Sequence, residues 1–205
     1  MITEMIEAFT AVLARVGRDG IPKDRFVFLQ EFLKNPQEVA SIIPSSRYLE
    51  RRVVKLGEIT SAKTVVELGS GTGGTTRAIL QAMHPDARLL GIEINPGFYQ
   101  SITQISDNRL IAHLGSAHEL QSILAEYHLN SPDVIISGIP FSLIDESLGT
   151  QIIREISSVL PDGGRFLAYQ IRDRVAELAL PLLGEANVEV EFLNIPPVRV
   201  FCWEK

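Results

Sequence analysis

Val65-Val66-Glu67-Leu68-Gly69-Ser70-Gly71-Thr72-Gly73-Gly74 carries the pattern that decides the fold of this chain. A β-branched apolar run ends in an acid, glycines follow at alternate positions, and a helical pattern begins after them. Glycine permits a sharp turn and the close approach of a nucleotide, because it has no Cβ. The stretch therefore predicts a strand, a tight turn and a helix N-terminus that together bind a nucleotide cofactor.

The glycines fit two kinds of nucleotide site. Three of them match the G-x-G-x-x-G fingerprint of NAD-binding domains, and Glu93 follows at about the spacing of the acid that binds the ribose. The pattern Glu67-x-Gly69-x-Gly71-x-Gly73 instead resembles motif I of the class I S-adenosylmethionine-dependent methyltransferases. About 60 residues with helical patterns precede the motif, and we expect no second domain after it. Both features favour S-adenosylmethionine over NAD.

Apolar strand-like runs alternate with amphipathic helical runs after the motif. The expected strands are 64–68, 88–93, 109–113, 133–137 and 164–170, and the expected helices are 74–83, 96–105, 118–127, 145–160 and 173–182. Two final strands, 188–193 and 198–203, are separated by too few residues for a helix, so they should pair antiparallel. We predict an α/β, Rossmann-like class I methyltransferase fold with a seven-stranded, mostly parallel sheet and a C-terminal antiparallel hairpin.

The chain is expected to form a single domain over residues 1–205, with its Rossmann-like core at 61–205. Residues 1–60 are expected to be helical. Residues 2–16 have an apolar face of helical period, a second helix covers residues 26–33, and Ser45 or Ser46 caps a third that runs towards Ile59. The first helix ends with Arg15 near its C-terminus and is followed by Arg18, Lys23 and Arg25, so we expect it to serve as a lid or to contact an anionic membrane surface reversibly.

Composition excludes several classes of protein. The net charge is −6, and Lys and Arg show no strong cluster, so nucleic acid is not an expected partner. No apolar run reaches the ~18 residues of a membrane span. The acids Glu4 and Glu7 argue against a secretory signal, and the lone Cys202 fits a reducing cytoplasm. The four histidines have no metal-ligand spacing, so no metal is expected. We expect a cytoplasmic monomer that is peripherally associated with the membrane.

Acids and hydroxyls at the ends of the first three strands predict the donor site. Glu93 ends the second strand and should accept hydrogen bonds from the ribose hydroxyls. Glu67, directly before the glycine turn, should orient backbone amides or reach the amino group of the donor through water. After the third strand, many class I methyltransferases carry an acid that accepts from the adenine amine. This chain has Ser116 there, and a hydroxyl is a weaker acceptor than a carboxylate.

Ser137-Gly138-Ile139-Pro140-Phe141 follows the fourth strand, where class I enzymes bring the acceptor beside the methyl group. Methyltransferases of nucleobase amines usually carry Asn/Asp-Pro-Pro-Tyr/Phe there, and the Asn or Asp takes the amine hydrogens. Ser137 does not reproduce that role well. The loop therefore predicts an acceptor site for a non-planar amine, and a plain turn is the alternative.

Nearly the whole chain resembles the bacterial phospholipid N-methyltransferase family. The similar segments are Phe32-Leu33-x-x-Pro36, Pro44-Ser45-Ser46-Arg47, Ser137-Gly138-Ile139-Pro140 and Asn194-x-Pro196-Pro197-x-Arg199-Val200, in addition to the glycines shared by all class I enzymes. Ribosomal RNA adenine dimethyltransferases are the nearest relatives in pattern, but they carry the planar-amine motif and a basic C-terminal extension.

The resemblance implies transfer of methyl groups from S-adenosylmethionine to phosphatidylethanolamine, towards phosphatidylcholine. The residues it implies for the donor site are Ser45, Glu67, Gly69, Gly71, Gly73, Glu93, Ile94, Ser116, Ala117 and Ser137. The implied catalytic residues are Tyr48, Ser137, Pro140 and Phe141, and the implied substrate-binding residues are Ser46, Arg47, Tyr169 and Arg199. Of these, Tyr48 is expected to orient the amine, Phe141, Tyr169 or Tyr48 to make cation–π contacts, and Arg199 to hold the lipid phosphate.

Four alternatives stay open at this point. These alternatives are a ribosomal RNA adenine methyltransferase, a methyltransferase of a small amine, a nucleotide-binding oxidoreductase module, and a protein that binds S-adenosylmethionine without turnover.

Overall fold

The computed structural model describes residues 46–194 and 197–205. The expected helices at 2–16 and 26–33, and the donor-site residue Ser45, lie outside the described residues. Within the described part of the chain, no helix is long and apolar enough to cross a bilayer.

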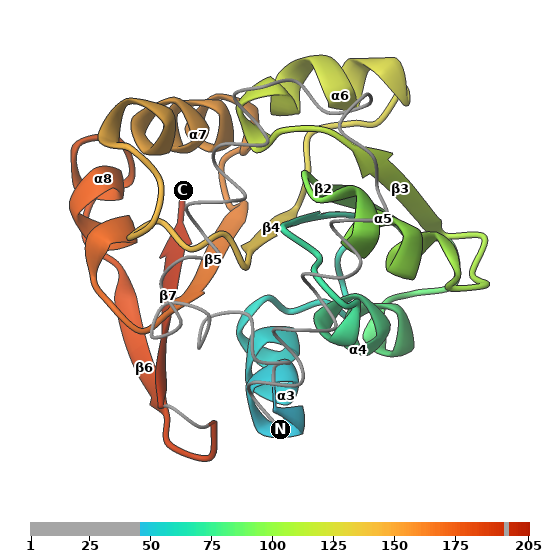
Figure 1. The fold of residues 1–205 in the computed structure, drawn as a ribbon, viewed down its shortest axis with the longest axis horizontal. Helices are drawn as coiled ribbons and strands as arrows, with labels where there is room; N and C mark the ends of the chain where they lie inside the picture. The colour runs from blue at the N-terminus through green and yellow to red at the C-terminus, as the bar shows by residue number, and fades with distance from the viewer. Residues whose placement is uncertain (1–45, 195–196) are drawn as a thin grey trace. The chain divides into compact units, whose positions relative to one another are not determined.

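Seven strands form one sheet, which is seen edge-on in Figure 1. Its order is β3-β2-β1-β4-β5-β7-β6. The strands are β1 (Thr64–Leu68), β2 (Arg88–Glu93), β3 (Leu110–Leu114), β4 (Val134–Ser137), β5 (Arg165–Gln170), β6 (Asn187–Glu191) and β7 (Val198–Glu204). The first five pair in parallel. Every residue of β1 is buried, as expected for a central strand covered on both faces. The predicted parallel sheet is therefore confirmed.

The C-terminal hairpin is also confirmed, because β7 pairs antiparallel with both β5 and β6. The strand predicted at 188–193 ends earlier, at Glu191. The reason is local: the carboxylate of Glu191 accepts a hydrogen bond from the backbone N–H of Leu193 at 2.9 Å. This bond turns the chain away from the ladder and begins the β6–β7 turn.

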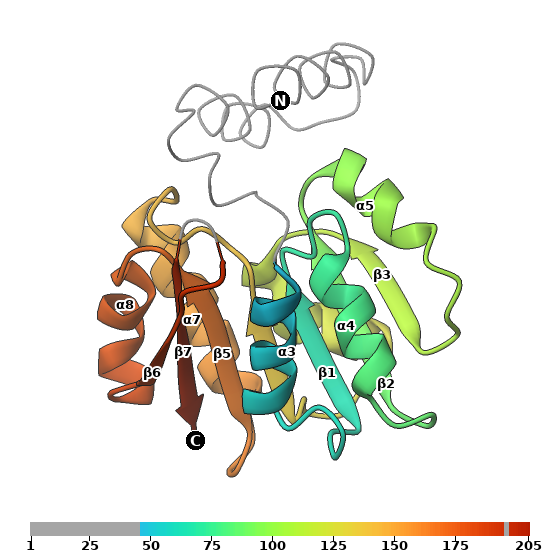
Figure 2. The same cartoon turned by 90° about the horizontal axis from the view of Figure 1, so that it is seen from below.

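Helices cover both faces of the sheet, as Figure 1 shows, and Figure 2 looks onto one of these faces. They are α3 (Arg47–Leu56), α4 (Gly74–Ala82), α5 (Pro96–Thr103), α6 (Leu120–Glu126), α7 (Glu146–Val159) and α8 (Arg174–Leu183). The helix predicted at 118–127 begins instead with a 3-10 turn over Ala117–Glu119. The predicted cap of the third helix is confirmed for Ser46, whose hydroxyl accepts from the N–H of Leu49 at 3.3 Å.

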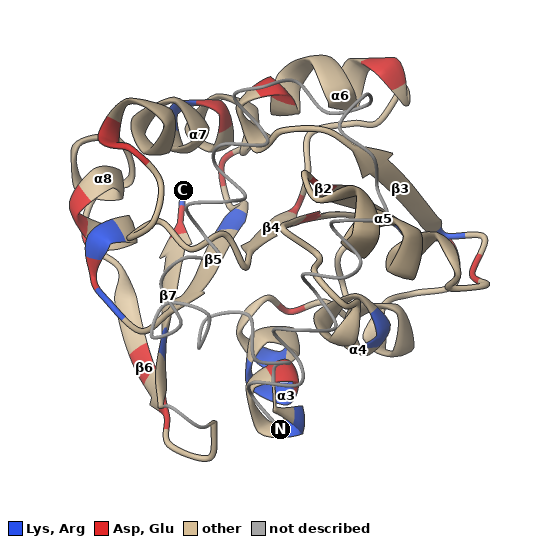
Figure 3. Ribbon diagram, in the orientation of Figure 1, with Lys and Arg blue, Asp and Glu red and all other residues tan. Residues whose placement is uncertain are grey.

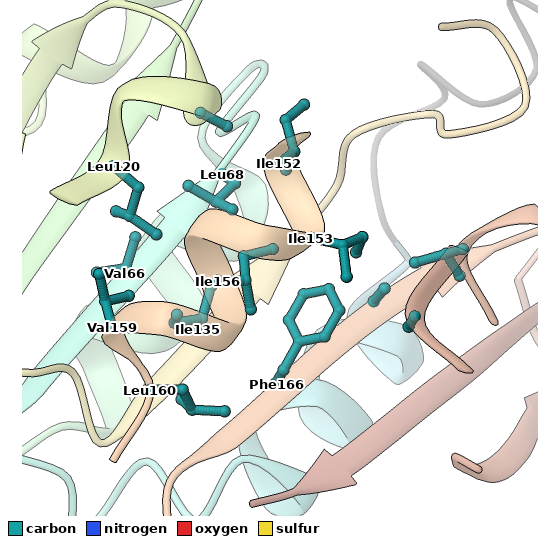
Figure 4. Close-up of a cluster of buried hydrophobic side chains, with 14 of the residues drawn as sticks. Val66, Leu68, Leu120, Ile135, Ile152, Ile153, Ile156, Val159, Leu160 and Phe166 are labelled. Carbon is teal, nitrogen blue, oxygen red and sulfur yellow. The ribbon is translucent and has the colours of Figure 1, made fainter. Parts of the chain in front are cut away.

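Two apolar layers hold these helices to the sheet. The larger layer packs α6, α7 and α8 against one face, and Figure 4 shows its centre, where Ile153 and Ile156 of α7 lie near Phe166 of β5. The other face carries α3 and α4. Leu49 and Val53 of α3 are 2% and 0% exposed, so this helix is part of the core layer.

Polar contacts fix α3 to the C-terminal hairpin. Nε of Arg52 lies 2.8 Å from a carboxylate oxygen of Glu191, and a second nitrogen of Arg52 pairs with Glu189. At the start of the helix, the N–H of Ser46 donates to Oδ1 of Asn194 at 3.0 Å. The segment before the sheet and the last turn of the chain are thereby held side by side.

The topology places the site. Strands β1, β2, β4 and β5 are parallel, so their carboxyl ends meet at one edge of the sheet. The chain order reverses direction between β1 and β4. Ligands of open α/β sheets bind outside the carboxyl ends at such a switch point.

Candidate active site

The turn after β1 exposes bare backbone at the switch point. Gly69, Gly71 and Gly73 have φ angles of +76°, +54° and +82°, a region that side chains rarely adopt. A Cβ at Gly69 would lie 3.4 Å from the backbone nitrogen of Ile139, whereas a Cβ at Gly71 would meet no atom within 4 Å. Gly69 therefore lets the turn pack against the loop after β4, and Gly71 leaves room for a ligand against the backbone.

Glu93 holds this turn in place. Its side chain is 4% exposed, and its two oxygens accept from the backbone N–H groups of Gly71 and Asn95, each at 2.8 Å. Burial raises the pKa of this carboxyl, and the backbone hydrogen bonds oppose the rise. Each carboxylate oxygen can accept a second hydrogen bond, so the expected ribose contact remains compatible with this arrangement.

Glu67 is fully buried at the end of β1. Thr76 of α4 donates its hydroxyl to one carboxylate oxygen at 2.6 Å. The other oxygen has no hydrogen-bond partner among the described residues. Burial is the main reason that the pKa of Glu67 rises to about 7, and the hydroxyls of Thr76 and Ser70 partly offset the rise.

The described residues fit the expected methyl donor. Within the described part of the chain, three buried polar atoms make no hydrogen bond of good geometry, namely one oxygen of Glu67, the hydroxyl of Ser70 and the side-chain nitrogen of Asn95, although Ser70 is close enough to Glu67 to lower the pKa of its carboxyl. Unsatisfied buried polar atoms are rare and often mark the place of a missing ligand or water. Glu67 lies at the end of β1, Ser70 lies in the glycine turn, and Asn95 lies in the loop after β2. All three segments adjoin the open backbone of Gly71. Glu67, Glu93 and the glycines would hold S-adenosylmethionine, which supplies an electrophilic methyl group when bound.

At the expected adenine position, Ser116 is 6% exposed and its hydroxyl lies 2.7 Å from Nδ1 of His118. The neighbouring Ala117 is also buried, and Ile94 after β2 is half-buried. A serine hydroxyl that donates to the imidazole keeps its lone pairs free to accept from an amine. His118 is therefore the group that orients Ser116, a role that the sequence analysis did not assign.

The loop after β4 lies beside the glycine turn. The hydroxyl of Ser137 is fully buried and accepts from the N–H of Ile139 at 3.2 Å. Gly138 is required there, because a Cβ would lie 2.5 Å from the hydroxyl of Tyr169 and 3.0 Å from the carbonyl of Gly69. Tyr169 of β5, half-buried, is thus brought next to the loop that contains the half-buried Pro140.

Two of the expected acceptor contacts are not supported by the side-chain positions. Phe141 is 0% exposed and belongs to the larger apolar layer, so its ring packs in the core instead of facing a methylated amine. Arg199 pairs with Asp173 at 2.6 Å on the surface, so a lipid phosphate would have to compete with that carboxylate. Both outcomes depend on packing partners that are distant in the sequence.

The start of α3 carries the remaining expected residues. Ser46 caps the helix, and its hydroxyl is used by the backbone. Tyr48 is 37% exposed, with the guanidinium of Arg47 stacked 5.1 Å from the centre of its ring. These positions remain predictions of substrate contact.

Sequence reasoning missed four residues that shape the site: Thr76, Asn95, His118 and Gln170. Gln170, at the end of β5, donates its side-chain N–H to the carbonyl of Ile139 at 2.6 Å and so supports the acceptor loop. Asn95 follows Glu93 closely and precedes Pro96, a helix-start signal that could have located it. The other three contacts required the folded arrangement.

Gly71→Ala tests the open backbone, with Gly163→Ala as its matched control. Both glycines have positive φ and no atom within 4 Å of an added Cβ, so each substitution should cost a similar free energy of folding, about 1–2 kcal/mol. Only the Cβ at Gly71 enters the donor space. In titration calorimetry, the dissociation constant of S-adenosylhomocysteine should be at least about tenfold higher for Gly71→Ala, which is equivalent to roughly 1.4 kcal/mol. Equal binding by both variants would refute this position of the donor.

Glu67→Gln tests the buried acid through pH. Because the folded-state pKa lies above that of the unfolded chain, the folded state holds an extra proton between about pH 4.5 and 7. Stability is therefore lost as pH rises through that window, by something on the order of 3 kcal/mol. Glu67→Gln removes the titration, so its Tm relative to the parent should increase from pH 5 to pH 8 in the ligand-free protein. The exposed Glu126→Gln serves as control. If the Tm difference between Glu67→Gln and the parent does not change with pH, this role of Glu67 is contradicted.

Comparison with known proteins agrees with the geometry. A family model described as a methyltransferase domain matches residues 59–201. The ornithine lipid N-methyltransferase of Singulisphaera acidiphila is 34% identical over 146 residues, which are 70% of this chain and 76% of that protein. The ribosomal RNA small subunit methyltransferase A of Caulobacter vibrioides is 28% identical over 106 residues, which are 50% of this chain and 37% of that protein.

Among solved structures, the O-methyltransferase from Bacillus cereus in complex with SAH matches 98% of this chain and 100% of its own, with a TM-score of 0.64 and 16% identity. This likeness shows the fold alone, and it confirms the predicted class I fold with its C-terminal hairpin. The family match extends over most of the chain, and the expected donor is confirmed with it. The chain belongs to the S-adenosylmethionine-dependent methyltransferases and is an enzyme of class I.

Proposed function

We propose that this enzyme methylates the head-group amine of a membrane lipid. The observation that carries the proposal is the 34% identity to a lipid N-methyltransferase over 76% of that protein's length. The Ser-Gly-Ile-Pro loop after β4 supports it, because this loop lacks the amide or carboxylate with which nucleobase methyltransferases take planar amine hydrogens. The resemblance of the chain to phospholipid N-methyltransferases points to the same class of acceptor.

The chemistry requires a neutral amine. A lipid amine with a pKa near 10 is neutral in only about one molecule in a thousand at pH 7, which corresponds to roughly 4 kcal/mol. A dry site beside a cationic donor favours loss of the amine proton. No exposed carboxylate or imidazole is fixed at the acceptor loop by a contact between described residues. Positioning against the donor therefore supplies most of the acceleration in this proposal.

The described residues at the acceptor loop are suited to orientation. The hydroxyl of Ser137 is used by the backbone, so it does not act as a base. The hydroxyl of Tyr169 lies 3.5 Å from that of Thr75, at the first turn of α4. It stands between the glycine turn and the acceptor loop, where it can accept a hydrogen bond from an incoming amine. We assign Tyr169 this orienting role within the proposal.

Two lipids are the leading acceptors. Phosphatidylethanolamine, on its way to phosphatidylcholine, is the acceptor implied by the sequence resemblance. An ornithine lipid is the acceptor named for the relative from Singulisphaera acidiphila. Both present a primary amine on a lipid held in a membrane, and this shared chemistry is the proposal. We place phosphatidylethanolamine first, because the Ser-Gly-x-Pro and Asn-x-Pro-Pro-x-Arg segments resemble the phospholipid enzymes.

A methyl-transfer assay tests this proposal. The full chain is incubated with S-adenosylmethionine carrying a labelled methyl group and, in separate reactions, phosphatidylethanolamine, an ornithine lipid, ethanolamine and ribosomal RNA. Label should enter a lipid, with mass spectrometry giving the number of methyl groups added. Glu93→Ala, which removes the carboxylate that holds the glycine turn, should reduce the rate at least tenfold through weaker donor binding. Label in RNA or ethanolamine with none in either lipid would refute the proposal.

A further inference from the structure

We propose that the protein rests on anionic bilayers through a surface at the β6–β7 turn, on the same sheet edge as the active site. We call this surface the hairpin rim. It consists of Phe192 and Leu193 of the turn, Ile171 and Arg172 after β5, and Arg47 and Tyr48 at the start of α3. The choice of a lipid surface rests on the proposed function, and the surface itself rests on the observations that follow.

The apolar side chains of the rim are unusually exposed. Phe192 and Leu193 are 74% and 60% exposed, the two highest values among the large apolar residues of the described chain, and Ile171 is 39% exposed. Turns are normally polar, and grouped exposed apolar residues mark contact surfaces. The bond between Glu191 and the N–H of Leu193 holds the base of the turn, so these side chains are presented outward on a fixed support.

The three segments of the rim lie close together. Gln170 of β5 pairs with Arg199 of β7, and Glu191 of β6 pairs with Val198. Because neighbouring strands are about 4.8 Å apart, the loop after β5 and the β6–β7 turn are separated by only about two strand spacings. The bond between Asn194 and the N–H of Ser46 brings in the start of α3. Figure 2 shows the turn and the start of α3 at one edge of the sheet.

The charges of the rim suit anionic head groups. Arg47 and Arg172 are exposed and form no ion pair with any residue that the structure describes, and the same holds for Arg51 one turn along α3. Three of the nearby acids are already engaged, Glu189 and Glu191 by Arg52 and Asp173 by Arg199. The fourth, Glu50 of α3, is half-buried next to Gly74. Figure 3 shows several basic positions, and one acidic position, on α3. Basic side chains that pair with no described acid are complementary to anionic lipids, even on a protein of net charge −6.

The rim also lies next to the acceptor loop. The side chain of Gln170, which directly precedes Ile171, donates to the carbonyl of Ile139 in that loop. A lipid whose chains stay in the bilayer can present its head group only to an edge that faces the membrane. The rim would place the carboxyl edge of the sheet, and with it the acceptor loop, against the head groups. Burial of apolar tips with flanking arginines is the chemistry of interfacial binding.

Phe192→Trp tests the contact directly, with Leu180→Trp as matched control. Leu180 is 53% exposed on α8, which runs from the carboxyl edge towards the opposite edge, and the native Trp203 is 2% exposed and insensitive to the surroundings. With vesicles of phosphatidylcholine and phosphatidylglycerol, the indole introduced at position 192 should shift its emission to the blue and be quenched by brominated acyl chains. The indole introduced at position 180 should show neither effect. Vesicles of phosphatidylcholine alone should have a weaker effect.

Three results would overturn the proposal. They are an unquenched indole at position 192, equal quenching at position 180, and an emission from position 192 that is already blue-shifted without vesicles. The last would mean that another part of the chain or a second copy covers the rim.

Activity separates this proposal from the proposed function. Phe192→Ser combined with Leu193→Ser should lower vesicle binding roughly tenfold or more, because two large apolar side chains are lost. Its rate should fall on vesicle lipid and stay unchanged on lipid dispersed in detergent, with unchanged binding of S-adenosylhomocysteine. Leu180→Ser with Leu182→Ser should match the parent.

The two assays together distinguish the two failures. In one outcome, the Phe192→Trp variant methylates lipid while its introduced indole stays in water. That result overturns the proposal for the hairpin rim and leaves the proposed function standing. Quenching of that indole without lipid methylation supports the rim and refutes the proposed function.

Discussion

The site depends on the two backbone hydrogen bonds of Glu93. A nearly buried carboxylate is costly unless hydrogen bonds satisfy it, and here its oxygens accept from Gly71 and Asn95. These bonds connect the turn after β1 to the start of α5, where Asn95 in turn caps the helix by accepting from Gly97 at 2.8 Å. Loss of the carboxylate would therefore release both loops at once. Glycine permits the unusual backbone conformation of the turn, and the hydrogen bond from Gly71 to Glu93 stabilises it.

The second acid of the site is arranged differently. Glu67 has one satisfied oxygen and one without a partner among the described residues, and its pKa of about 7 records the cost of that burial. A buried carboxyl group of this kind lowers the stability of the ligand-free protein at neutral pH. A hydrogen-bond donor of a bound ligand would offset that loss. Active sites commonly carry this kind of cost, because residues placed for a ligand are not placed for the stability of the empty fold. The amino group of a bound methyl donor is a partner of the right charge.

Sequence patterns predicted the elements well because their causes are local. The buried β-branched runs of β1 and β4 and the glycine turn could be read from residue type and spacing. Ser46 was one of two serines predicted to cap the third helix, because a serine at a helix start commonly caps it. Phe141 and Arg199 show where that reasoning ends. Whether an aromatic ring packs in the core and whether an arginine already has an acidic partner depend on side chains from distant strands and helices. The bonds from Thr76 to Glu67 and from Gln170 to Ile139 were missed because they join different elements, whereas the contact of His118 with Ser116 is local and was overlooked.

The central claim is that the turn after β1 and Glu93 bind S-adenosylmethionine and not a nicotinamide cofactor. The most direct test is titration calorimetry of the full chain with S-adenosylhomocysteine and, separately, with NAD, repeated on Glu93→Ala. The account predicts saturable binding of S-adenosylhomocysteine, markedly weaker binding after Glu93→Ala, and no comparable binding of NAD. Preferential binding of NAD, or affinity for S-adenosylhomocysteine that is unchanged by the loss of Glu93, would contradict it.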